Sequence, residues 1–155
     1  MARVLVTGMS GTGKSTVLIE LALRGHRTVD LDDGDWSYEA PALDGPGLEQ
    51  LWREDEVAAL LSDGAPIVIG GCASNQGRFY PLLDTVLLLT VPPDVLLHRI
   101  SSRSSKDFGK DPDERARILA DFEAVEPRLR LSATAEIDAT RALQDVVDDV
   151  QTYLR

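Results

Sequence analysis

Residues 8–15 read GMSGTGKS, and this stretch marks where a first strand ends and a first helix begins. It matches the pattern G-x-x-x-x-G-K-[ST], in which glycines let the backbone bend so that successive N–H groups converge on phosphate oxygens. Just before it, residues 3–7 (RVLVT) form a short apolar run rich in β-branched residues, and apolar residues recur at helical spacing over residues 14–24. The order strand, loop, helix predicts a phosphate-binding loop (P-loop) that holds an anion at the positive end of the helix.

The P-loop pattern assigns roles to particular side chains. Lys14 is expected to reach the β- and γ-phosphates of ATP, and the Ser15 hydroxyl is expected to bind Mg²⁺. The remaining contacts with the nucleotide are expected from the rest of the loop and the next residue of the helix, namely Gly8, Ser10, Gly11, Thr12, Gly13 and Thr16. The motif therefore predicts ATP, with its product ADP, and Mg²⁺ as ligands.

After the loop, apolar strand patterns alternate with helical patterns. Further strands are expected at HRTVDLDD (26–33), PIVIGG (66–71), DTVLLLTV (84–91) and AEIDA (135–139). Helices are expected over residues 48–61, from 94 to about 103, from 112 with Pro127 as a kink or early end, and after Thr140. This alternation predicts one three-layer α/β domain over residues 1–155, with helices on both faces of a parallel sheet.

Charge and composition exclude several kinds of partner. The 155 residues include 16 Lys and Arg against 26 Asp and Glu, a net charge of −10 that repels nucleic acids and anionic membranes. No apolar run approaches the roughly 18 residues that span a bilayer, and the strand pattern starting at Arg3 leaves no room for a signal peptide. The single cysteine, Cys72, cannot form an internal disulfide. We therefore expect a cytoplasmic monomer or homodimer that binds small molecules, and neither nucleic acid nor membrane.

Carboxylates gather at the end of the second expected strand. They are Asp30, Asp32, Asp33 and Asp35. Motor and transport ATPases usually have an acid after a later strand, but here the later strands end in Gly-Gly and Val-Pro, and the N-K-x-D element of switch GTPases does not occur. The position of the acids favours a small-molecule kinase, because it puts carboxylates beside the P-loop, where Mg²⁺ and an acceptor hydroxyl must meet.

Two of these acids are given distinct roles. Asp30 is the better candidate for orienting metal-bound water, and Asp32 for accepting or positioning the proton of the acceptor hydroxyl. Asp35 is an almost equal alternative as the base. All the acids could instead be solvated groups that cap the strand end.

The string GMSGTGKSTV, followed by VDLDDGDW, resembles the shikimate kinase and gluconate kinase branch of the P-loop kinases, a group related to adenylate kinase. The resemblance implies a nucleoside-monophosphate-kinase-like fold with five parallel strands in the order 2-3-1-4-5. It also implies an acceptor-binding segment at about residues 34–62 and a lid at about 103–112. The implied activity is ATP-dependent phosphorylation of a hydroxyl or phosphate on a small acceptor, either a polyol acid of the gluconate or shikimate type or a nucleoside monophosphate.

Further motifs resemble those of the same kinases, and each implies a role for individual residues. WREDE is similar to the F-R-x-x-E of shikimate kinases and implies that Arg53 binds the acceptor, and IVIGGC is similar to their glycine-rich loop and implies acceptor contacts at Gly70 and Gly71. HRISSR is similar to the R-x-x-x-R of adenylate kinases, which implies Arg99 beside the adenine and Arg103 as a catalytic residue at the phosphates.

Transfer of phosphate in an acidic protein requires locally concentrated positive charge, which adds Arg78 to the expected acceptor site. Trp36, just beyond the acidic strand, is a candidate wall of the acceptor pocket, with Asp32 and Asp35 beside it. A surface ion pair is the alternative for each arginine, and a core position is the alternative for Trp36.

Two other functions stay open at this point. One is a nucleotide-binding regulator or ATPase that uses the loop without a small-molecule acceptor, and the other is a structural domain with a vestigial loop. A kinase differs from both because it forms ADP in proportion to an added acceptor.

Overall fold

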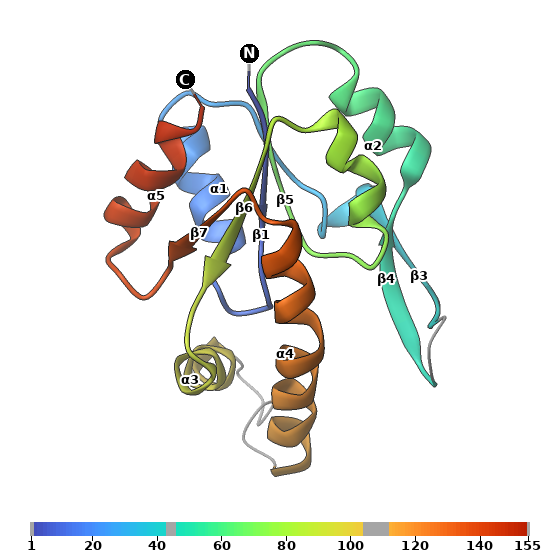
Figure 1. Ribbon diagram of the computed structural model, residues 1–155, viewed down its shortest axis with the longest axis vertical. Helices are drawn as coiled ribbons and strands as arrows, with labels where there is room; N and C mark the ends of the chain where they lie inside the picture. The colour runs from blue at the N-terminus through green and yellow to red at the C-terminus, as the bar shows by residue number, and fades with distance from the viewer. Residues whose placement is uncertain (1, 43–45, 104–111, 155) are drawn as a thin grey trace.

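The computed structural model describes residues 2–42, 46–103 and 112–154. Five strands form one parallel sheet in the order β2-β5-β1-β6-β7 (Figure 1). They are β1 (Arg3–Thr7), β2 (Thr28–Asp30), β5 (Ile67–Gly70), β6 (Thr85–Thr90) and β7 (Ala135–Asp138). Counted along the chain within this sheet, the order is 2-3-1-4-5, so the predicted topology is confirmed.

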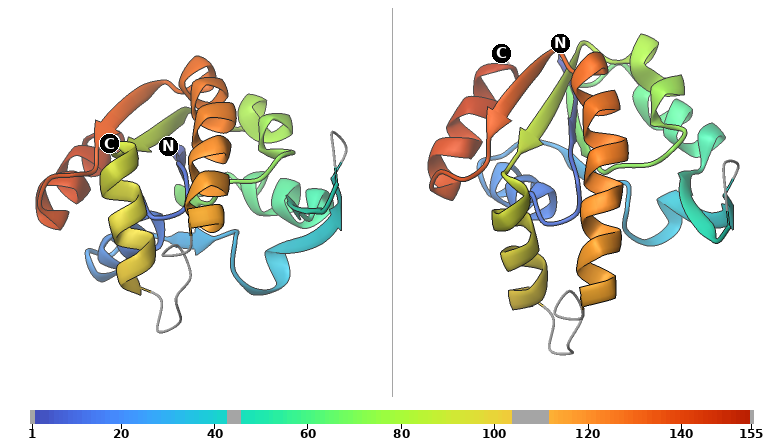
Figure 2. Two further views of the ribbon diagram at one scale, coloured as in Figure 1. Left: turned by 90° about the horizontal axis from the view of Figure 1, so that it is seen from below. Right: turned by 60° about the horizontal axis from the view of Figure 1, so that its bottom comes forward.

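Helices cover both faces of the sheet. They are α1 (Lys14–Leu23), α2 (Glu54–Leu61), α3 (Pro93–Arg103), α4 (Pro112–Ser132) and α5 (Leu143–Thr152). Alternate residues of β1 face opposite ways: Val4 and Val6 pack with α1, α3 and α5, whereas Leu5 packs with α2. All three side chains are fully buried, as expected for the central strand of a parallel sheet. The result is the predicted three-layer arrangement (Figures 1 and 2).

A hairpin replaces part of one predicted helix. Strands β3 (Ser37–Pro41) and β4 (Leu48–Trp52) pair antiparallel in a second, two-stranded sheet, and α2 begins only at Glu54. The prediction of a helix over residues 48–61 is therefore wrong for residues 48–52. Leu48, Leu51 and Trp52 have helical spacing, but Trp52 pairs with Ser37 in the hairpin and its side chain is fully buried against the α2 side of the sheet.

Helix α3 lies beyond the carboxyl ends of the strands, and the first part of α4 lies beside it, whereas the end of α4 packs against the sheet near β6 (Figure 2). Helix α4 includes Pro127 and continues to Ser132, so the early end that this proline suggested does not occur. The segment between the two helices, residues 104–111, lies outside the described residues, and most of the predicted lid falls there.

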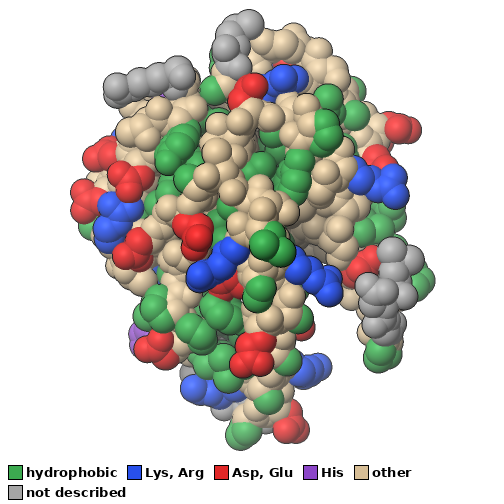
Figure 3. Space-filling view, in the orientation of Figure 1, with side chains coloured by type: hydrophobic (Ala, Val, Ile, Leu, Met, Phe, Trp, Pro, Cys, Tyr) green, Lys and Arg blue, Asp and Glu red, His purple; other side chains and the backbone are tan. Residues whose placement is uncertain are grey.

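The described surface is acidic overall but mixed in sign. In the view of Figure 3, Lys and Arg side chains are scattered among acidic ones and do not gather over one element. An ion pair between Arg24 and Asp148, at 2.7 Å, joins α1 to α5. None of the described helices has both the length and the apolar character needed to cross a bilayer.

Gly70, at the end of β5, allows α1 to approach the sheet closely. A Cβ at this position would lie 2.4 Å from Cδ1 of Leu18, which is in α1 and buried. We expect Gly70→Ala to lower the free energy of unfolding by about 1–3 kcal/mol, because the helix must shift to make room. Urea denaturation measures this loss, with Gly77→Ala as control, since a Cβ there would have its nearest neighbour at 4.0 Å. Equal midpoints for the two variants would contradict this account of Gly70.

Candidate active site

The P-loop joins β1 to α1 and is closed by its own hydrogen bonds. Thr12 donates from its hydroxyl and from its backbone N–H to the Met9 carbonyl, at 2.8 and 3.2 Å. Gly8 has a φ of 149°, and a Cβ there would lie 2.8 Å from the Leu89 carbonyl oxygen. Gly13 precedes α1 in a left-handed conformation and provides no side-chain cap, so the first N–H groups of the helix can meet an anion.

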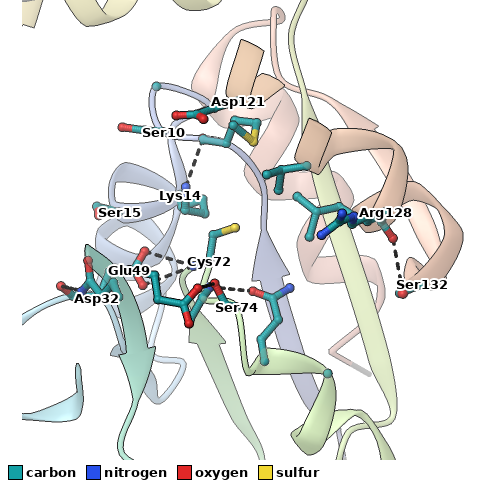
Figure 4. Close-up of a pocket in the computed structure, with 18 of the residues that line it drawn as sticks. Ser10, Lys14, Ser15, Asp32, Glu49, Cys72, Ser74, Asp121, Arg128 and Ser132 are labelled. Carbon is teal, nitrogen blue, oxygen red and sulfur yellow. Dashed lines mark hydrogen bonds between the residues drawn. The ribbon is translucent and has the colours of Figure 1, made fainter. Parts of the chain in front are cut away.

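Lys14 lies over this loop. Its Nζ donates to the carbonyl oxygens of Gly8 and Met9, at 2.7 and 3.0 Å. The close-up in Figure 4 shows the side chain between the loop and the residues that follow β5. The ammonium group is therefore held at the point where the loop would receive phosphate.

Ser15 and Asp30, the two residues predicted to serve the metal, are in direct contact. The Ser15 hydroxyl donates to Asp30 Oδ2 at 2.6 Å, although one residue lies in the first turn of α1 and the other ends β2. A hydroxyl and a carboxylate oxygen are ligands that suit Mg²⁺, which usually keeps several waters and takes its other ligands from nucleotide phosphates. In the described part of the chain, no group of three or more His, Cys, Asp or Glu could hold a metal ion.

Asp32 is anchored by two donors that orient its carboxylate. The Cys72 backbone N–H donates to Oδ2 at 3.0 Å, and the Trp52 indole N–H donates to Oδ1 at 3.3 Å. Burial raises the pKa of Asp32, while the Trp52 hydrogen bond and the charge of Lys14 act in the opposite direction. Gly71 leaves room for this arrangement, because a Cβ there would lie 2.7 Å from Asp32 Oδ1.

Of these groups, Lys14, Ser15 and Asp32 line one cavity of about 910 Å³. Its walls are the P-loop, the first half of β4, the segment after β5 and one face of α4 (Figure 4). Sequence reasoning missed several of its lining side chains, namely Glu49, Gln50, Ser74, Gln76, Tyr80, Asp121, Arg128 and Ser132. Residues 121, 125, 128 and 132 recur at helical spacing, a signal that could have located the α4 face but not what it faces.

Gln76 connects the segment after β5 to the end of β1. Its side chain is 4% exposed, accepts from the Ala73 backbone N–H at 2.9 Å, and donates to Thr7 Oγ1 at 3.2 Å and to the Tyr80 hydroxyl at 2.9 Å. Such a saturated buried network fixes backbone position. It therefore holds the part of the cavity wall that follows β5 in place.

Several predicted acceptor-binding residues do not line this cavity. The Arg53 guanidinium lies 5.3 Å from the centre of the Tyr38 ring, and Arg78 is exposed and pairs with Glu54 at 3.2 Å. Trp36 packs against the core on the α2 side, and Gly70 faces α1. Asp35 is exposed in a short 3₁₀ turn, Gly34–Trp36. The Arg103 side chain lies outside the described residues.

Arg99 occupies the other side of the P-loop. Its guanidinium donates to the carbonyls of Gly11 and Thr12, both at 3.4 Å, and to the Ala139 carbonyl at 2.7 Å. It borders a second hollow of about 420 Å³ between the P-loop, α3 and the start of α5. The structure thus places Arg99 beside the loop, on the side away from Asp32. The resemblance implies that the adenine base of the nucleotide lies next to Arg99.

Comparisons with known proteins give the same fold. A family model described as an AAA domain matches residues 4–120. The HPr kinase/phosphorylase of Xanthomonas campestris pv. campestris (strain B100) is 36% identical over 81 residues, which are 52% of this chain and 26% of that protein. The matched part is thus about a quarter of the length of that relative.

Two solved structures cover nearly the whole chain. A gluconokinase from Sinorhizobium meliloti 1021 superposes with a TM-score of 0.66 at 20% identity, over 99% of this chain and 91% of that one. A shikimate kinase from Acinetobacter baumannii, in complex with shikimate, superposes with a TM-score of 0.64 at 17% identity, over 98% and 92%. At this identity the likeness shows a common fold.

Proposed function

The chain belongs to the AAA domain family of P-loop proteins, and on that premise we propose that it is an ATP-dependent kinase that phosphorylates a small molecule. The resemblance to the P-loop small-molecule kinases is confirmed by the family and by the fold. One observation carries the proposal. Lys14 and Asp32 line the same cavity, beside the contact between Ser15 and Asp30.

Each of these residues has a part in the proposed reaction. Lys14 neutralises charge on the transferred phosphate, and Asp32 accepts the proton of the acceptor hydroxyl. The hydroxyl oxygen forms a bond to the γ-phosphorus as the bond to the β-γ bridging oxygen breaks, and that electron pair leaves with ADP. Asp32 then releases its proton to water.

Ser15 and Asp30 fit Mg²⁺ by the chemistry of their oxygens. When bound, the ion supplies charge neutralisation at the β- and γ-phosphates. Arg99 and the backbone of the P-loop would hold ATP, and Arg103 is proposed at its phosphates. Oriented donors and positioning account for most of the catalysis in phosphoryl transfer, so this small set of groups is sufficient.

A screen for acceptor-dependent ADP release tests the proposal. The purified chain is incubated with ATP and Mg²⁺ and with single members of a panel of polyol acids, sugars, aminocyclitols and nucleoside monophosphates. We expect ADP to form in proportion to one class of acceptor, with a phosphorylated product seen by mass spectrometry. Slow ADP formation that no acceptor accelerates would instead favour a regulator or ATPase, and failure to bind ATP or ADP at millimolar concentration would favour a structural domain. We further propose that the kinase is cytoplasmic and acts as a monomer or homodimer.

A further inference from the structure

The hairpin brings a carboxylate into the wall of the cavity. Glu49, in β4, accepts a hydrogen bond on Oε2 from the Ser74 hydroxyl at 2.9 Å. Its other oxygen, Oε1, is buried and has no hydrogen-bond partner among the described residues. A buried carboxylate oxygen without a donor is costly, so this atom gains most from a donor that a ligand brings. Glu49 lines the cavity, and the terminal torsion of glutamate is broad, so Oε1 is free to turn toward a bound ligand.

The charges around Glu49 define what that donor can be. Among the described residues lining the cavity, the cations are Lys14 and Arg128, and the carboxylates are Asp32, Glu49 and Asp121. Lys14 lies against the P-loop, and Figure 4 shows Arg128 on α4, across the cavity from Glu49 and Asp32. The side of the cavity formed by the hairpin is therefore negative.

The arginines that could have reversed this sign are engaged elsewhere. Arg53 lies over Tyr38, and Arg78 pairs with Glu54. A carboxylate on the acceptor would meet Glu49 and Asp32 with like charge, which disfavours binding. An ammonium group would instead make a charge-assisted hydrogen bond, roughly twice as strong as a neutral one.

From this geometry we infer that the acceptor is a cationic amino alcohol, of the amino-sugar or aminocyclitol class, whose ammonium group binds Glu49 while a hydroxyl faces Asp32. This assignment rests on the kinase function proposed above. It selects one chemical class of acceptor and disfavours the carboxylate-bearing ones.

Calorimetry with matched probes, in saturating ADP and Mg²⁺, tests the assignment. Glucosamine and 2-deoxystreptamine carry amines, glucose and myo-inositol are neutral, and gluconate and shikimate carry carboxylates. We expect at least one amine to bind about tenfold or more tightly than its neutral counterpart, and the carboxylates to bind weakest. Glu49→Gln should remove the preference for the amine. Glu39→Gln, an exposed position on the facing strand β3, is the matched control and should retain it.

The outcomes separate this inference from the proposed function. Tighter binding of a neutral or carboxylate probe overturns the inference, and so does amine binding that Glu49→Gln leaves unchanged. Binding of ADP without binding of any amine overturns it too, and leaves the kinase proposal standing. Failure to bind ADP counts against both. The probe comparison on the unaltered protein keeps the test decisive if Glu49→Gln does not fold, which circular dichroism reveals.

Discussion

Lys14→Ala is expected to lower kcat/KM for phosphoryl transfer by about 10³-fold or more while the protein stays folded. The ammonium group is held over the P-loop by the Gly8 and Met9 carbonyls, so its removal takes away a charge that is already in place to meet the developing phosphate charge. The free energy of unfolding should change little, because the half-buried Lys14 side chain is not part of the hydrophobic core on either face of the sheet.

The measurement is steady-state kinetics with the acceptor found in the screen, together with the melting temperature of each variant. Arg27→Ala is a suitable control, since Arg27 is a cation outside the cavity that pairs with Asp63 at 2.9 Å. Normal turnover by a folded Lys14→Ala protein would refute the role given to this lysine.

Asp32→Asn is expected to lower kcat by about 10²–10⁴-fold with little change in ATP affinity. Asparagine can still accept the Cys72 N–H bond, but it cannot take a proton from the acceptor hydroxyl. Because burial raises the pKa of Asp32, the base loses activity as the pH falls through a value above the 3.8 of an ordinary aspartate. The variant should therefore lack this acidic limb in its profile of kcat against pH.

Two comparisons make this test specific. Asp33→Asn alters an exposed neighbour and should keep near-normal turnover, whereas Asp35→Asn tests the alternative base. A collapse of ATP affinity with normal turnover in Asp32→Asn would make Asp32 part of the metal site. The burial that raises the pKa also makes ionised Asp32 cost stability; this cost builds as the pH rises above 3.8 and is complete above the raised pKa. At neutral pH the asparagine variant escapes this cost, but it has one amide oxygen where the carboxylate has two to accept from Trp52 and Cys72.

The sheet could be predicted from the sequence because its strands are local, continuous apolar runs. Residues 3–7 were predicted to the residue, and their neighbours in the sheet followed from the strand order of the resembling kinases. The hairpin could not be predicted this way. Residues 48–52 have apolar side chains at helical spacing, and only pairing with residues 37–41 and the burial of Trp52 make them a strand.

The same division holds for the site. Lys14, Ser15, Asp30 and Asp32 follow from one motif and one strand end, and the structure brings all four together. The arginines depend on partners distant in sequence, such as Glu54 for Arg78, 24 residues away. Glu49 could not be found before the hairpin was known. The roles of these residues, the arginines and Glu49 included, stay predictions to be tested as described.

The hydrogen bond from the Trp52 indole to Asp32 gives the cavity an optical reporter. The chain has two tryptophans, so replacing Trp36 with phenylalanine would leave the emission of Trp52 alone. Indole fluorescence responds to the charge and solvation of a bonded carboxylate. The occupation of the site and the protonation of Asp32 can therefore be followed in real time without any label.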